Sequence, residues 1–157
     1  MIRRPPRSTQ GVSSAASDVY KRQDSKSVKF DLNFALNEIA VGRKNTTSMI
    51  SIKTWLDDEY LTSYWADGLI ISTPTGSTGY SLSCGGPVIM PESESLVLTP
   101  IAPHNLSARP LVIPAKHKIS LKISGRENEF LVSLDSRINS LKNSTTITIK
   151  KAPTASK

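Results

Sequence analysis

The chain has 157 residues and a formal net charge of +7, which is enough sequence for one domain with its own hydrophobic core. The positive charge is concentrated in the first 23 residues, where five basic side chains accompany one acidic side chain. Aromatic residues make up 6% of the sequence, too few for the aromatic platforms on which single-stranded nucleic acids stack. The charge therefore argues only weakly for a nucleic-acid partner, the low aromatic content argues against one, and both are compatible with a small anionic ligand.

Cysteine and apolar content bear on the cellular compartment. Cys84 is the single cysteine, so no intrachain disulfide can form, which fits a reducing compartment. No apolar run approaches the roughly 20 residues of a membrane-spanning helix, and the basic N-terminus lacks the apolar segment of a secretory signal. The sequence thus predicts a cytoplasmic protein without a membrane partner.

The first 23 residues, MIRRPPRSTQGVSSAASDVYKRQ, have almost no large apolar side chains and no periodicity. They cannot bury enough surface to offset the entropy lost on ordering, so we expect residues 1–23 to be disordered. The string also resembles translated sequencing-adapter sequence. We therefore interpret residues 1–23 as an artefactual leader, residues 24–153 as the folded domain and residues 154–157 as a polar tail.

The domain shows many short apolar segments separated by turns. Residues 34–41 have a composition that suits either a strand or a helix, whereas residues 99–110 contain three prolines and must be irregular. Alternating or short buried patterns predict strands at 49–55, 60–64, 69–72, 96–99, 111–113, 117–124, 130–135 and 145–150. This pattern indicates a mainly β, sandwich-like fold and not a βαβ fold.

One stretch, DGLIISTPTGSTGYSLSCGGP from Asp67 to Pro87, stands out as a candidate nucleotide site. A short apolar strand leads into residues 72–80, which consist almost wholly of Ser, Thr, Gly and Pro. Such a loop offers hydroxyls and bare main-chain N–H groups. A short helix from Thr78 to Ser83 would add its first amides, and Tyr80 and Ser83 would share one face of it. The competing interpretation is an ordinary surface turn.

Other polar residues are weaker candidates taken alone. Asn37 has the amide donor and acceptor that read an adenine edge, and Glu38 could accept ribose hydroxyls, but both also fit a solvated strand end. Asp67 could bind a ribose or a nicotinamide amide, or cap a turn. His104 has no histidine or cysteine partner nearby, so we expect no metal site. The GxSxG, Walker A and GxGxxG motifs are absent.

Three motifs together resemble the C-terminal part of NAD kinase: ALNEIAV, ADGLIISTPTGSTGYSLSCGGPV and TPIAPHNLSARPLVIP. The resemblance implies phosphorylation of the adenosine ribose 2′-hydroxyl of NAD to give NADP, with ATP or polyphosphate as donor and a divalent cation such as Mg²⁺. It also implies a subunit in which an α/β domain, missing here, precedes a β-rich NAD-binding domain. Subunits of the family form dimers or tetramers.

The resemblance also implies roles for individual residues. Asn37 would hold adenine and Glu38 the ribose hydroxyls, and Asp67 would reach the nicotinamide end. The remaining residues implied in NAD binding are Thr75, Thr78, Gly79, Tyr80, Ser83, Ala102 and His104, the last two contributing across a subunit contact.

Two departures from the family pattern matter. Ser136 follows Asp135 where the family usually has glycine, which puts the turn and the role of Asp135 in doubt. The chain also contains no GGDGT motif, whose aspartate is thought to act as the base, so we expect no catalytic residue here and an inactive fragment. The alternative function is a β-sandwich binding or assembly module without catalytic activity.

Overall fold

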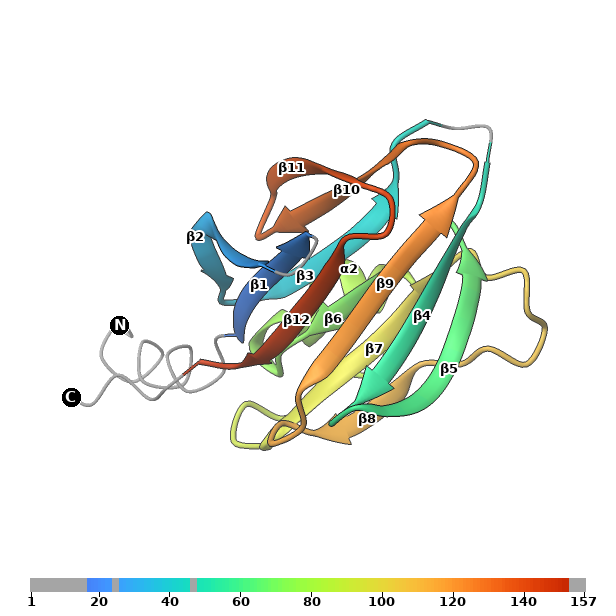
Figure 1. The fold of residues 1–157 in the computed structure, drawn as a ribbon. Helices are drawn as coiled ribbons and strands as arrows, with labels where there is room; N and C mark the ends of the chain where they lie inside the picture. The colour runs from blue at the N-terminus through green and yellow to red at the C-terminus, as the bar shows by residue number, and fades with distance from the viewer. Residues whose placement is uncertain (1–16, 24–25, 46–47, 153–157) are drawn as a thin grey trace.

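A computed structural model describes residues 17–23, 26–45 and 48–152 of the chain (Figure 1). Every strand pairing that it describes is antiparallel, and the strands form two six-stranded sheets. Within these residues, no helix is long and apolar enough to cross a membrane. The mainly β fold expected from the sequence is therefore confirmed.

The first sheet, here called sheet A, lies nearer the viewer in Figure 1. In spatial order its strands are β2 (Lys26–Ala35), β1 (Ser17–Gln23), β12 (Thr146–Lys151), β9 (Ile119–Gly125), β4 (Ile50–Leu56) and β5 (Glu59–Ala66).

The second sheet, sheet B, packs behind it. In spatial order its strands are β11 (Arg137–Lys142), β10 (Glu129–Leu134), β3 (Glu38–Arg43), β6 (Gly68–Ser72), β7 (Ser95–Ile101) and β8 (Leu111–Pro114).

The core lies between the two sheets because their strands alternate buried and exposed positions. On β9, Ile119, Leu121 and Ile123 are fully buried, as the alternation in the sequence predicted. They belong to one apolar cluster with Val41 of β3 and Leu69 of β6. The molecule is thus a two-layer sandwich whose opposite layers share a single core.

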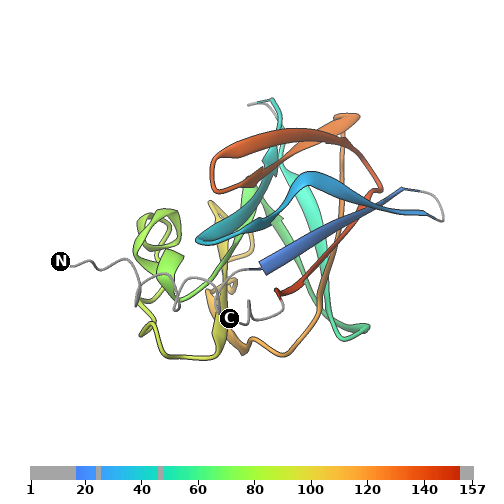
Figure 2. The same ribbon diagram turned by 90° about the vertical axis from the view of Figure 1, so that its left-hand side faces the viewer.

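Strand β6 is buried on both faces, unlike a typical sandwich strand. Ile71 lies in the core cluster, whereas Ile70 is equally buried but points to the other side of sheet B. That side is covered by a segment that contains the 3₁₀-helix η1 (Thr75–Thr78) and the single-turn helix α2 (Tyr80–Ser83). Figure 2 shows these turns on the face of sheet B that points away from sheet A.

A buried pair of hydroxyl groups holds the segment with η1 and α2 against sheet B. The Ser81 hydroxyl lies 2.9 Å from the Thr99 hydroxyl of β7, and Gly86 passes so close that a Cβ there would lie 2.3 Å from the Ser81 oxygen. Only glycine fits at position 86, because the side chain of any other residue would force this segment away from the sheet.

The structure differs from the sequence-based expectations at several places. Residues 17–23 form strand β1 although they belong to the leader expected to be disordered; residues 1–16 and the tail at 154–157 lie outside the described residues. Residues 34–41 are neither one strand nor a helix, because the chain leaves sheet A at Leu36 and Asn37 and enters sheet B at Glu38. Strand β11 was not predicted, since its sequence RINSLK is mostly polar and exposed. The expectation that residues 99–110 are irregular was wrong for residues 99–101, which continue strand β7 and pair with β6.

The first of these differences has a main-chain cause. Strand β1 pairs with β12 on one side and with β2 on the other. Main-chain hydrogen bonds to a sheet edge need no apolar side chains, and a composition argument for disorder does not take them into account.

Candidate functional site

The crossover between the sheets, residues 36–38, lies directly against the loop that follows β6. The Thr73 hydroxyl donates to the Leu36 carbonyl at 2.7 Å, and the Thr73 N–H donates to the Asn37 carbonyl at 3.0 Å. Gly76 packs on the same peptide, because a Cβ there would lie 2.0 Å from the Asn37 carbonyl oxygen. Residues almost 40 positions apart are thereby brought into one site.

Several of the loop amides are already bonded within the protein, contrary to expectation. The Gly76 N–H donates to the Thr73 hydroxyl, and the Ser77 and Gly79 N–H groups donate to loop carbonyls. The Ser77 hydroxyl is buried and bonded to the Pro74 carbonyl. These groups stabilise the loop and are therefore not free to bind a ligand.

Helix α2 is shorter than predicted. It begins at Tyr80, not Thr78, and consists of four residues. The dipole of so short a helix is small and adds little positive potential at the loop. Within the helix Ser81 is buried, and Tyr80, Leu82 and Ser83 are all exposed.

Glu38 is the acidic centre of this end of the site. It is half-buried, and burial raises the pKa of its carboxyl group, while a hydrogen bond from the Tyr80 main-chain N–H opposes that rise and the charge of Asp135 adds to it. Gly79 is close as well, since a Cβ there would lie 3.5 Å from the carboxylate. A half-buried carboxylate that accepts one N–H bond keeps further acceptor capacity, so it is able to accept hydroxyl donors.

Asn37 presents its side chain to solvent. It is exposed, and among the described residues its amide side chain has no hydrogen-bond partner, although its main chain is bonded on both sides. Thr78 is exposed and Thr75 half-buried in the neighbouring η1. This end therefore offers an amide, a carboxylate and two hydroxyls together.

Tyr80 lies near both Glu38 and Asp67. Partial burial raises the pKa of its phenol, and the nearby acidic groups of Cys84, Glu38 and Asp67 raise it further, so the phenol stays neutral and able to donate. The ring is 45% exposed, which leaves one side available to a ligand.

Asp67 lies at the other end of β6, a five-residue strand that spans about 16 Å. Its carboxylate forms an ion pair of 3.1 Å with Arg43, and its main-chain N–H donates to the Ile101 carbonyl. Ala102 follows immediately, exposed and with φ of 47°. Asp67 and Ala102 are thus neighbours.

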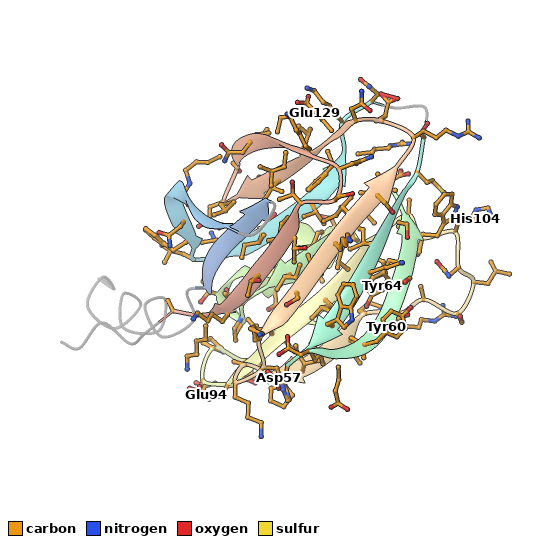
Figure 3. All side chains as sticks on the ribbon, viewed as in Figure 1. Asp57, Tyr60, Tyr64, Glu94, His104 and Glu129 are labelled. Atoms are coloured by element: carbon orange, nitrogen blue, oxygen red, sulfur yellow. The ribbon has the colours of Figure 1, made fainter. Side chains whose placement is uncertain are left out.

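His104 is separate from the Asn37 end. Its main-chain N–H donates to the Trp65 carbonyl of β5 at 2.7 Å, and Figure 3 shows it beside β5, at the outer edge of sheet A. The structure therefore gathers the predicted residues at the two ends of β6, with Tyr80 between them and His104 outlying.

Sequence reasoning missed two residues of the site. Thr73 supplies the contacts between loop and crossover, and Arg43 pairs with Asp67. A threonine directly after a buried strand is a weak signal, and no local pattern connects Arg43 with a residue 24 positions away.

The described residues contain no group of three or more His, Cys, Asp or Glu side chains that could hold a metal ion. The side chains present therefore do not fit a metal held by the protein alone.

Comparisons with known proteins identify the family of the chain. The family described as the ATP-NAD kinase C-terminal domain matches residues 36–157. The NAD kinase of Christiangramia forsetii is 75% identical over 121 residues, and that of Flavobacterium psychrophilum is 72% identical over 123 residues. These matches cover 77% and 78% of this chain and 41% and 42% of the relatives.

Solved structures give the same result. Yeast NADH kinase complexed with NADH superimposes with a TM-score of 0.81 at 29% identity, covering 88% of this chain and 40% of that one. An NAD kinase from Archaeoglobus fulgidus in complex with ATP superimposes with a TM-score of 0.73 at 32% identity, covering 88% and 51%. The chain spans about two fifths of the length of its curated relatives, and it belongs to the ATP-NAD kinase C-terminal domain family.

Proposed function

We propose that this chain supplies the dinucleotide-binding part of an NAD kinase, an enzyme that transfers a phosphoryl group to the adenosine ribose 2′-hydroxyl of NAD and yields NADP. One observation carries the proposal: the crossover with Asn37 and Glu38 is bonded to the loop with Thr75, Thr78 and Tyr80. An exposed amide beside an acceptor carboxylate suits an adenosine, whose base edge both donates and accepts and whose ribose donates.

The two ends of β6 suggest how a dinucleotide would lie. Asn37, Glu38, Thr75, Thr78 and Gly79 would contact the adenosine half, and Tyr80 and Ser83 would line the middle. The nicotinamide half would then reach Asp67 and Ala102. His104 would contribute only from a second subunit, which is consistent with its position beside β5.

The remaining features of the enzyme belong to the same proposal. ATP is the expected donor, with a divalent cation such as Mg²⁺ that takes most of its ligands from phosphates and water. Support comes from the neighbours complexed with NADH and with ATP. A dimeric or tetrameric whole protein is proposed, and the single cysteine supports a cytoplasmic location.

Calorimetric titration of the chain with NAD tests the binding role. We expect saturable binding that Asn37→Ala weakens at least tenfold. The control, Asn139→Ala, changes an exposed asparagine on β11 and should leave the affinity unchanged. No binding by the unmodified chain would reject the proposal and favour an assembly module without this ligand. Equal affinity of the two variants would reject the contact between Asn37 and the ligand.

The catalytic role needs a separate assay. The sequence lacks GGDGT, and proton abstraction requires a base within hydrogen-bond reach of the hydroxyl. We therefore expect NADP formation from NAD and ATP to stay at the level of a blank without protein. Turnover above the blank would show that the chain itself contains a sufficient base.

A further inference from the structure

The β10–β11 turn places one carboxylate against three consecutive main-chain N–H groups. Oδ2 of Asp135 accepts from Leu36 at 2.6 Å, and Oδ1 accepts from Asn37 at 2.9 Å and from Glu38 at 3.0 Å. These donors are the three residues of the crossover between the sheets. They are almost 100 positions from Asp135 in sequence, so no local pattern predicts the contact.

An ionised carboxylate is the chemically appropriate partner for this arrangement. Successive N–H groups that point the same way form a concavity for anions, and a carboxylate has two oxygens that accept without any competing donor. An amide side chain would turn its NH₂ group toward one of the three N–H donors. Hydrogen bonds to an ionised acceptor are also about twice as strong as neutral ones.

The turn itself aims the carboxylate. Leu134 pairs with Arg137 across a two-residue loop, in which Asp135 has φ of 48° and Ser136 has φ of 75°. Both values belong to the hairpin turn usually formed by Asp-Gly or Asn-Gly. The Asp135 N–H then donates to the Glu38 carbonyl at 3.1 Å, so Asp135 and Glu38 are bonded in both directions. Replacement of the usual glycine by Ser136 has therefore not altered the turn.

A second contact holds the same segment on its other side. The carbonyls of Leu36 and Asn37 accept from Thr73, and Arg137 donates to the Phe34 carbonyl just before the crossover. The main chain of the crossover is thus bonded through both its N–H and its C=O groups. Its side chains remain available, since Asn37 is exposed and Glu38 is half-buried.

We infer that Asp135 is a positioning residue of the candidate site: its carboxylate fixes the main chain of residues 36–38 and thereby the direction in which the Asn37 and Glu38 side chains point. This inference rests on the proposed dinucleotide-binding function. It assigns Asp135 no contact with the ligand, because both of its carboxylate oxygens are taken by the protein.

The test compares Asp135→Ala and Asp135→Asn with a matched control. Asp57 occupies the same position in the two-residue β4–β5 turn, with φ of 50°, and its carboxylate also accepts a main-chain N–H, from Lys118 at 2.8 Å. Asp57→Asn therefore perturbs an equivalent turn that forms no part of the candidate site. For each full-length variant, amide hydrogen exchange of residues 36–38, the thermal midpoint and the Kd for NAD are measured.

For Asp135→Ala we expect exchange of the residue 36–38 amides to rise about tenfold more than that of β9 amides, and the Kd for NAD to rise about tenfold. Asp135→Asn keeps one acceptor oxygen and should fall between this variant and the unmodified chain. Asp57→Asn should lower the thermal midpoint without changing the Kd.

Unchanged exchange at residues 36–38 in Asp135→Ala would overturn the inference, as would an equal loss of NAD affinity in Asp57→Asn. Failure of the proposed function has a different signature. In that case no variant, nor the unmodified chain, binds NAD, while the exchange of residues 36–38 still reports whether Asp135 fixes the crossover.

Discussion

Gly76 lies against the Asn37 peptide so closely that a Cβ on Gly76 would sit 2.0 Å from the Asn37 carbonyl oxygen and 2.7 Å from its Cα. The two residues come from different segments of the chain: Gly76 lies in the turn after β6, and Asn37 lies in the crossover into β3. Because both contacting groups are main chain, neither can rotate away. This contact sets the spacing between the two halves of the candidate site.

Gly76→Ala should therefore destabilise the protein by about 2–3 kcal/mol, the usual cost of overpacking where the surroundings cannot relax. It should also abolish NAD binding, since Asn37 must move. Urea denaturation and titration measure the two effects. Gly42→Ala is the control, because a Cβ there would find its nearest neighbour at 3.7 Å; a similar loss in both variants would contradict the prediction.

Thr73→Val should cost about 2 kcal/mol of unfolding free energy. Valine has the same shape, but the Leu36 carbonyl loses its donor and the Gly76 N–H loses its acceptor, and unpaired buried polar groups cost about 1–3 kcal/mol each.

Thr54→Val is the matched control for that variant. Thr54 is equally buried, yet its hydroxyl reaches only the Ile52 carbonyl at 3.4 Å, so its replacement should be close to neutral. Equal losses in the two variants, measured by urea denaturation, would mean that the Thr73 hydrogen bonds add nothing to stability.

Ser136→Gly should stabilise the protein by about 0.5–1 kcal/mol. Ser136 has φ of 75°, a conformation that costs a residue with a Cβ about 1–2 kcal/mol and glycine very little, offset in part by the greater freedom of glycine in the unfolded chain. Thermal unfolding measures the gain. Ser120→Gly, inside β9, should instead lower the thermal midpoint, and a decrease for both would refute the strain argument.

Glu38→Gln should raise stability at pH 8 and change it less at pH 4. The pKa of Glu38 is raised in the folded state, chiefly by burial. The protonated carboxyl group therefore contributes its full stabilisation below the unfolded-state pKa, and this contribution is lost as pH rises through the folded-state pKa. Glutamine stays neutral and avoids that loss. The same change should weaken NAD binding, because the ribose would lose an ionised acceptor.

Glu129→Gln provides a control of opposite sign. A hydrogen bond from Lys44, helped by Ser140, lowers the pKa of Glu129, so its stabilising effect is present above the unfolded-state pKa and is lost as pH falls. That variant should be slightly less stable than the unmodified chain at pH 8 and similar at pH 4. Urea denaturation at the two pH values checks both signs, and parallel responses would contradict them.

Much of the fold could be predicted because most strands carry a local pattern. The alternation of Ile119, Leu121 and Ile123 identifies β9, and the same pattern identifies β12. Strand β11 carries no such signal, since it is an edge strand whose side chains are mostly exposed. Strand β1 is held by main-chain pairing with β12 and β2. This pairing does not require an apolar pattern in the sequence of β1, so composition does not reveal it.

The sequence predicted some residues of the candidate site and missed others. The residues proposed to contact a ligand, such as Asn37 and Tyr80, belong to recognisable motifs. The residues that hold them in place do not, because Thr73 and Asp135 act through the main chain of distant segments. The expectation of bare loop amides was wrong for Gly76, Ser77 and Gly79 for the same reason, since these N–H groups donate to acceptors within the loop.

The pairing of β1 with β12 has a practical consequence for anyone who trims the gene. The match to known kinases begins at residue 36, which makes that position an obvious place to cut. Such a cut would remove the neighbour of β12 on one side, while β9 stays on the other. The exposed edge of β12 would then present unpaired main-chain donors and acceptors, on which strands of other molecules can pair and cause aggregation. A shortened version would need a substitute strand, or a charged side chain facing outward there, to remain dispersed in solution.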